Sequence, residues 1–420
     1  MRIVVTGLIA SYPLGGVSWD YLQYIQGLQL LGHDVIYLED TGQWVYNPER
    51  GSFTDDCSLN LRYLEQVLAF LEPKATTRWS FRSPGGEYFG LAEHEIERVC
   101  NEADLFINVS GCCWLRERYQ GCARKLYMDT DPLYTQYKLE AMRRGVATTD
   151  QAYSVDLILK HDLFFTFAEN IADPSCRIPS CGLTWHTTRQ PIVLEDWPFI
   201  FSPKAKAFTT VMSWKNDVTP PSIAGKSYGG KDVEFMKFMN LPSRVSAVME
   251  IALSGSAPFD QLRQNGWEVV DGYEKSSTMD AYRSYVGGSR GEWSIAKNAY
   301  VAPRSGWFST RSAVYLALGK PVVVQDTGFR PYYPVGEGLT AFTNLDEAVS
   351  AIESIEADYR RHCDAARAIA EKQFSSEMVL GRLLRDAGVS NDGTHKHGGP
   401  LNFPARGAKR KTDSTERTKI

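Results

Sequence analysis

Ser309 and Thr310 stand directly before an Ala/Leu-rich run that predicts a helix over Thr310–Leu318, and Arg311 follows them. A Ser/Thr pair in this position is a helix-capping signal, and the free N–H groups of a helix start attract anions. The guanidinium of Arg311 adds a planar fork that can hold two phosphate oxygens. The pattern indicates a phosphate site, and an ordinary capped helix with a surface arginine is the alternative.

A glycine loop near the N-terminus is a second place where backbone could approach a ligand. Gly15 and Gly16 lie in Leu14-Gly-Gly-Val17, after the first strand pattern. Without Cβ atoms, their N–H groups can come close to a phosphate or a sugar. The spacing is not G-x-G-x-x-G, so dinucleotide binding is disfavoured. We expect the loop to face a substrate, with a simple turn as the alternative.

Two carboxylates follow the strand pattern Lys125–Met128, namely Asp129 and Asp131. An Asp-x-Asp pair can hold a metal ion, and a carboxylate can also take a proton from a hydroxyl group. Capping of the structure that begins at Pro132 is the plain alternative. We favour the proton-accepting role for these two residues, with His186 as the alternative base.

The elements that must position these residues alternate between strand and helix. In the first half, Arg2–Thr6 and Asp34–Glu39 are strand patterns around a helical pattern over Trp19–Leu31. This is a βαβ unit, and its crossover implies a parallel sheet. The later strand patterns of this half are Asp104–Val109, Lys125–Met128 and Leu163–Phe167, and its later helical patterns are Leu59–Leu71, Glu93–Cys100 and Leu133–Arg144.

The alternation resumes after a proline-rich stretch between Pro174 and Pro203. The strand patterns there are Phe208–Met212, Ala247–Leu253, Trp267–Val270 and Pro321–Gln325, and the helical patterns are Asp232–Met239, Met279–Val286, Thr310–Leu318 and Leu345–Ile355. The expected fold is α/β, with two Rossmann-like, doubly wound domains that face a central cleft. The expected parts are an N-terminal domain over 1–190, a linker over 191–206, a second domain over 207–356, bracing helices over 357–390 and a disordered basic tail over 391–420.

Composition narrows the class of protein. The chain has 420 residues and a net charge of −4; the last 30 contain seven Lys/Arg against three Asp/Glu, so the tail carries +4 and the rest −8. An acidic body argues against a nucleic-acid partner. No apolar run is long enough to span a bilayer and no signal peptide is recognisable, so we expect a cytoplasmic protein. The eight scattered cysteines are expected to be reduced, and no metal site is expected.

The order of features resembles the GT-B glycosyltransferases, in particular the branch with the CgeB-like and family 4-like proteins. When the motif ending Gly-x-Pro is aligned on Gly319-Lys-Pro321, the arginine of the CgeB-like variant coincides with Arg311. The two glutamates of the common motif fall on Gly306 and Val314, so both are absent and the ribose contact is unassigned. The resemblance covers Arg2 to about Gly388 and is strongest over residues 280–355.

This resemblance implies a metal-independent hexosyltransferase (EC 2.4) without a cofactor, which moves a sugar from a nucleoside-diphosphate donor to a small-molecule or glycan acceptor. In such proteins a lysine near the diphosphate balances the charge that grows on the leaving group. Lys215 is preferred for that role over Lys226 and Lys231. The full donor-binding set is Gly15, Gly16, Lys215, Lys231, Glu292, Ser309, Thr310, Arg311, Asp326, Thr327 and Gly328, and the catalytic set is Asp129, Asp131 and His186.

Other functions fit the same fold. A nucleotide-sugar epimerase or a hydrolase would need no separate acceptor, and a non-catalytic nucleotide-sugar-binding protein is consistent with the missing glutamates. An oxidoreductase is disfavoured by the glycine spacing.

Overall fold

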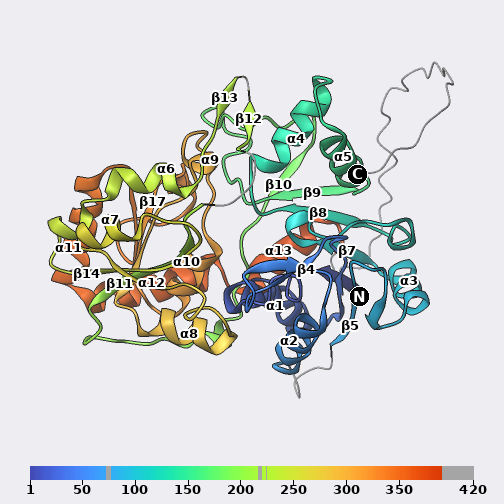
Figure 1. Ribbon diagram of the computed structural model, residues 1–420, viewed down its shortest axis with the longest axis horizontal. Coiled ribbons are helices and arrows are strands. Elements are labelled where there is room, and N and C mark those ends of the chain that lie inside the picture. The colour runs from blue at the N-terminus through green and yellow to red at the C-terminus, as the bar shows by residue number, and fades with distance from the viewer. Residues whose placement is uncertain (72–76, 216–219, 224, 390–420) are drawn as a thin grey trace. The chain divides into compact units, whose positions relative to one another are not determined.

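The computed structural model describes residues 1–71, 77–215, 220–223 and 225–389. The predicted basic tail lies outside these residues. Figure 1 shows two sheets, the first built from the blue to green part of the chain and the second from the yellow to orange part. No helix among the described residues is long and apolar enough to cross a membrane.

The first sheet has eight strands, parallel except for the last pair, β5 with β6. From one edge to the other they are β10 (Trp185–Thr187), β9 (Leu163–Thr166), β8 (Lys125–Asp129), β7 (Leu105–Asn108), β1 (Arg2–Thr6), β2 (Asp34–Glu39), β5 (Arg78–Arg82) and β6 (Tyr88–Gly90). A separate antiparallel pair is formed by β3 (Val45–Asn47) and β4 (Ser52–Thr54).

The central strand β1 shows why this sheet is covered on both faces. Its residues are buried in alternation: Ile3 and Val5 belong to one core, whereas Val4 packs in another with Ile96 and Val99 of a helix on the opposite face. A strand that is buried on both faces has a continuous run of apolar residues in its sequence. The helices of this half are α1 (Gly15–Leu30), α2 (Ser58–Ala69), α3 (Glu93–Glu102), α4 (Tyr134–Arg143) and α5 (Thr149–Leu159).

The second sheet has six strands, all parallel. In order they are β15 (Glu268–Asp271), β14 (Val248–Ser254), β11 (Ala207–Ser213), β16 (Gly291–Ser294), β17 (Val322–Gln325) and β18 (Leu339–Phe342). A short antiparallel pair is formed by β12 (Ser222–Ile223) and β13 (Lys226–Ser227).

Helices also cover both faces of the second sheet. Val322 and Val324 of β17 pack with the buried side of α10, whereas Val323 between them packs in the core that α11 completes. The helices of this half are α6 (Lys231–Phe235), α7 (Phe259–Gln264), α8 (Met279–Gly288), α9 (Asn298–Val301), α10 (Thr310–Ala317), α11 (Leu345–Ala357), α12 (Tyr359–Gln373) and α13 (Ser376–Asp386). The 3-10 turns are Val109–Gly111, Glu117–Tyr119, Leu194–Asp196, Met236–Phe238, Leu241–Arg244 and Arg330–Tyr332.

The chain crosses between the two halves twice, and the crossings pair with each other. Ile192 forms an isolated bridge with Ser375: the Ile192 N–H donates to Phe374 O at 2.7 Å and the Ser376 N–H donates to Ile192 O at 2.8 Å. Beyond this bridge α13 packs on α1 of the first half, where a Cβ on Gly27 would lie 2.6 Å from Leu380. The last described helix therefore covers the first sheet, although it follows the second in sequence.

Candidate functional site

The start of α10 has no side-chain cap in the described structure. Ser309 occupies the cap position in an extended conformation, but its hydroxyl makes no capping hydrogen bond. The Thr310 hydroxyl instead donates to the Asp20 carboxylate of α1, at 3.2 Å from Oγ1 to Oδ2. The capping signal that the sequence suggested is therefore not used as a cap. The N–H groups of the first turn keep their capacity to bind an anion.

Arg311 lies in the first turn of α10, and its guanidinium is bound by the protein. Nε donates to Glu292 Oε1 at 2.7 Å, and Nη1 donates to the carbonyl of Val211 at 2.9 Å. Glu292 is fully buried on β16, and its second oxygen, Oε2, has no hydrogen-bond partner among the described atoms. The Arg311 guanidinium, which the sequence predicted to bind phosphate, is therefore held in one orientation by Glu292. Only the N–H groups of Arg311 that remain free are available to a ligand.

Two lysines complete a group of cations around Arg311. Lys231 begins α6, and Lys297 follows β16. Burial, together with repulsion from Arg311 and Lys297, lowers the pKa of the Lys231 ammonium to about 7, although Asp131 and Glu292 oppose this effect. Cations that raise one another's energy in this way would be stabilised by a bound anion. Lys231 was predicted from the sequence, whereas Lys297 was missed.

Asp131 joins this group from the other half of the chain. Its Oδ1 accepts a hydrogen bond from Lys297 Nζ at 2.6 Å and another from the Tyr300 hydroxyl, and its side chain is 53% exposed. Partial removal from water favours the neutral acid, but Lys297 and Tyr300 outweigh it, so the pKa of Asp131 is below its ordinary value. The carboxylate is ionised at neutral pH and faces the cations.

Asp129, the other predicted carboxylate, is almost fully buried and accepts several hydrogen bonds. Its Oδ1 accepts from Thr135 at 2.9 Å, and its Oδ2 accepts from Gln136 at 2.8 Å and Thr166 at 2.9 Å. Burial raises its pKa to about 6, against these hydrogen bonds. The side chain links β8, β9 and the start of α4, and so fixes the turn that carries Asp131.

Asp20 was not singled out in the sequence, because it lies within a helical pattern among apolar residues. In the structure its carboxyl group meets Thr310 at the start of α10. Burial raises the pKa of Asp20 to about 7, while the hydrogen bond from Thr310 and the charge of Arg311 act in the opposite direction. An unusual pKa beside a candidate anion site is the kind of feature that marks functional residues.

The two glycines of the N-terminal loop are in contact with protein. The Gly15 N–H donates to Ser276 O at 2.6 Å, and a Cβ on Gly15 would lie 2.0 Å from the carbonyl oxygen of Thr278. A Cβ on Gly16 would meet the ring of Tyr282 at 3.2 Å. The close approach that these glycines permit here is between α1 and the segment leading into α8. Their role toward a substrate stays a prediction.

We expect Gly15→Ala to lower the free energy of unfolding by about 1–3 kcal/mol, since the added methyl group must displace the backbone of Thr278. Urea unfolding measures this difference. Gly288→Ala is the matched control, because nothing lies within 4 Å of a Cβ at that helical position. Its effect should be neutral or slightly stabilising. Equal stability of the Gly15→Ala variant and the unmodified chain would contradict the contact.

The other predicted residues lie elsewhere or bind protein groups. Lys215 is exposed after β11, and His186 lies on β10 with its ring stacked on Phe165 at 5.0 Å. Asp326 accepts from the Gly328 N–H at 2.7 Å, and the Thr327 hydroxyl donates to Trp307 O at 2.6 Å. These contacts shape the loop after β17, and among the described atoms no hydrogen bond or ion pair joins these residues to Arg311 or Lys231.

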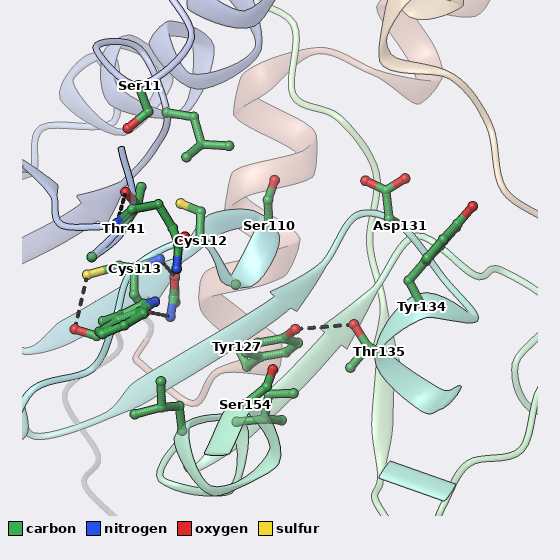
Figure 2. Close-up of a pocket in the computed structure, with 18 of the residues that line it drawn as sticks. Ser11, Thr41, Ser110, Cys112, Cys113, Tyr127, Asp131, Tyr134, Thr135 and Ser154 are labelled. Atoms are coloured by element: carbon green, nitrogen blue, oxygen red, sulfur yellow. Dashed lines mark hydrogen bonds between the residues drawn. The ribbon is translucent and has the colours of Figure 1, made fainter. Parts of the chain in front are cut away.

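A large cavity opens beside Asp131. Its volume is about 1160 Å³, and it lies where β1, β2, β7 and β8 end. Figure 2 shows the polar ends of Ser110, Asp131 and Tyr134 pointing to the same side of this cavity. Asp131 therefore belongs both to the cavity wall and to the ion pair with Lys297.

The sequence matches no protein-family model and no curated protein. Solved structures resemble it over nearly its whole length. An α-glucosyltransferase in complex with UDP and a 13-mer DNA is 12% identical, with a TM-score of 0.53, 92% of this chain covered and 100% of the other. AviGT4, a glycosyltransferase involved in avilamycin A biosynthesis, is 13% identical, with a TM-score of 0.52 and coverages of 92% and 97%. HepE from Anabaena in complex with UDP-glucose is 12% identical, with a TM-score of 0.53 and coverages of 92% and 99%.

The chain has the GT-B fold. This confirms the predicted architecture. At the two positions where the common GT-B sugar-transferase motif has glutamates, the packing explains their absence. Gly306 has a φ of +77°, and a Cβ there would lie 2.7 Å from the Asn170 nitrogen, while Val314 is 1% exposed within the core. Neither position can present a carboxylate without rearrangement. Two carboxylates that bind residues of α10 are those of Asp20, which accepts from Thr310, and Glu292, which accepts from Arg311.

Proposed function

We propose that the protein is a glycosyltransferase that takes a sugar from a nucleoside-diphosphate donor and transfers it to an acceptor hydroxyl, without a metal ion. The observation that supports this most directly is the group formed by Lys231, Lys297 and Arg311 at the uncapped start of α10. Structures with the same fold have been solved in complex with UDP or UDP-glucose, so UDP is the first nucleotide to test.

In the proposed reaction, the bond between the anomeric carbon and the donor phosphate oxygen breaks, and its electron pair stays on the diphosphate. The oxygen of the acceptor forms the new bond, and its proton passes to a base. The three cations would stabilise the charge that develops on the diphosphate, a role that a divalent ion fills in other enzymes. Asp131 is our candidate base, because it is ionised and lies between these cations and the cavity.

Calorimetric titration with UDP, GDP, dTDP and their sugars, in buffer that contains EDTA, tests this proposal. We expect saturable binding of at least one nucleoside diphosphate, since the chain provides the cations itself. Absence of binding to all of them would overturn the donor site. Release of free sugar at the same rate with and without any acceptor would favour a hydrolase.

The affinity for UDP-glucose should fall as the pH rises through about 7. The free protein holds the pKa of Lys231 at about 7, and a bound diphosphate must raise it, so the binding energy from this proton is present below pH 7 and is lost above it. The loss approaches tenfold per pH unit for one linked proton. UDP-glucose is the probe because its diphosphate is a diester without a group that titrates in this range.

The groups that face Lys231 are Arg311, Lys297, Asp131 and Glu292, and Asp20 lies near Arg311. Ionisation of Asp20 above pH 7 would place a negative charge beside the diphosphate, and so acts in the same direction. Lys231→Arg should reduce the dependence of UDP-glucose affinity on pH, because arginine does not titrate in this range. Asp20→Asn measures how much the ionisation of Asp20 contributes to that dependence. An unchanged slope in the Lys231→Arg, Asp20→Asn double variant would contradict this account.

A further inference from the structure

The lining of the cavity beside Asp131 restricts the chemistry of the molecule that could occupy it. Among the described residues that line it, Lys138 is the one ammonium or guanidinium group. Burial, offset only partly by Asp129, lowers the pKa of Lys138, and its Nζ donates to the Ser154 hydroxyl at 3.3 Å. His161 adds no charge, because burial lowers its pKa to about 4. The wall offers little to a phosphate or sulfate group.

The carboxylates of the wall reinforce this conclusion. Asp129 and Asp131 are both in the lining, and Asp150 is exposed at the start of α5. Asp131 is balanced by Lys297, but Asp150 has no cation partner among the described residues. A polyanion would have to bring its charges close to these carboxylates, with Lys138 as the one cation among the described residues of the wall. A nucleic-acid strand is therefore a poor fit.

Several exposed aromatic rings line the cavity. Trp44 is 59% exposed, Phe53 is 50% exposed and Tyr153 is 49% exposed, each more than is usual for such large side chains. Trp114 packs edge-on against Tyr153 at 5.5 Å, and Gly42, at a φ of +61°, brings its backbone onto the Trp114 ring. The Trp114 and Tyr153 rings are thus in contact with each other, and Tyr153 still presents surface to the cavity.

Uncharged hydrogen-bonding groups line the same cavity. Ser11, Thr41, Gln43, Ser110 and Ser154 belong to the lining, and the Ser110 hydroxyl points to the same side as Asp131 in Figure 2. A planar aromatic ligand would need few of these groups. A sugar ring combines a C–H face, which is attracted to the negative face of an aromatic ring, with hydroxyl groups around its edge that need hydrogen-bond partners.

We propose that this cavity binds an uncharged glycan, whose sugar rings stack on its aromatic side chains and whose hydroxyl is presented to Asp131. The inference rests on the proposed transferase function and names the class of its acceptor. The distribution of charge around Asp131 supports this proposal. The three cations Lys231, Lys297 and Arg311 lie on the side of Asp131 where an anionic donor would bind. The cavity on the other side of Asp131 is lined by an uncompensated carboxylate and by aromatic rings.

A glycan array tests the inference with the full-length protein saturated with UDP. The array should carry neutral, sulfated, phosphorylated and sialylated glycans in parallel, with duplex DNA printed beside them. We expect signals from neutral members only. Trp44→Ala and Phe53→Ala should weaken these signals several-fold, because each removes a ring face from the cavity. Phe201→Ala is the matched control: its ring is 39% exposed but stacks on Tyr359, outside the cavity.

Each outcome of this test bears on the inference separately from the donor site. UDP affinity is measured by calorimetry for every variant, and it should be unchanged in all of them. Predominant signals from charged glycans or from DNA would overturn the glycan assignment, as would equal signals from Phe201→Ala and Trp44→Ala. Normal UDP binding without any glycan signal would also overturn it, while the proposed transferase function would remain. Absence of binding to UDP, GDP and dTDP alike by the unmodified protein would instead reject the proposed function itself.

Discussion

Replacing Arg311 with alanine is expected to weaken UDP binding by about 1.5–3 kcal/mol, the range for hydrogen bonds to charged groups. The same change should lower the free energy of unfolding by about 3–5 kcal/mol, because it leaves the buried Glu292 carboxylate without its cation. Calorimetry at a temperature where the variant is folded measures the first effect, and urea unfolding measures the second. An unchanged affinity for UDP would show that α10 is not the helix that holds the diphosphate.

Two further variants separate binding from stability. In the Arg311→Met, Glu292→Gln double variant both charges are removed together, so much of the stability should return while UDP affinity stays low. Arg290→Ala is the matched control, since Arg290 is also buried and binds a glutamate, with Nε at 2.8 Å from Glu356 Oε1, but it is absent from the group around Lys231. It should lose stability and keep its affinity for UDP. Loss of UDP affinity in Arg290→Ala would mean that the Arg311 result reflects damage to the fold.

The second large effect is expected from Asp131→Asn. Removal of a positioned general base typically lowers the rate by about 10²–10⁴-fold, and the amide cannot accept the proton. Stability should change little, because the carboxylate is half exposed. The rate is measured as UDP release from UDP-glucose with a pool of neutral glycans as acceptors, and UDP affinity is measured in parallel to show that the donor site is intact.

Asp129→Asn provides the contrast. The amide nitrogen replaces one carboxylate oxygen and would face either the donor of Thr135 or those of Gln136 and Thr166, so this variant should lose about 1–3 kcal/mol of stability. The activity of each folded molecule should fall less than in Asp131→Asn. The reverse pattern, a fully active Asp131→Asn and an inactive but folded Asp129→Asn, would move the base to Asp129.

Several of the strands that the sequence predicted have a local pattern that matches their burial, although β18 has such a pattern and was missed. Arg2–Thr6 and Asp34–Glu39 were predicted with the bounds that the structure shows, because both are continuous apolar strands in the middle of a parallel sheet. Strand β16 was missed. Its Glu292 and Ser294 are buried but polar, and Glu292 is tolerated there through an ion pair with a residue 19 positions away. The hydrophobicity pattern of a strand does not indicate that a buried glutamate has an ion-pair partner elsewhere in the chain.

The same reason limits what could be predicted of the site. Arg311 was identified from its position in a recognisable helix start, but its partner Glu292 depends on how β16 lies beside α10. Lys297 and Asp131 are 166 residues apart, and Asp20 and Thr310 are 290 residues apart. Contacts of this kind depend on how the two sheets pack together, which local spacing does not encode. Residue types could therefore be listed as candidates, whereas their pairing needed the structure.

The position of α13 has a consequence for how the chain folds during its synthesis. Leu380, Leu383 and Leu384 of this helix belong to the same core as Leu22 and Ile25 of α1. Domains of a growing chain usually fold in order from the N-terminus. In this protein α1 cannot pack against α13 until α13 has been synthesised. The apolar surface of α1 that contacts α13 therefore stays exposed while the residues of the second sheet are being synthesised. A fragment that ends before α13 would lack this cover on α1.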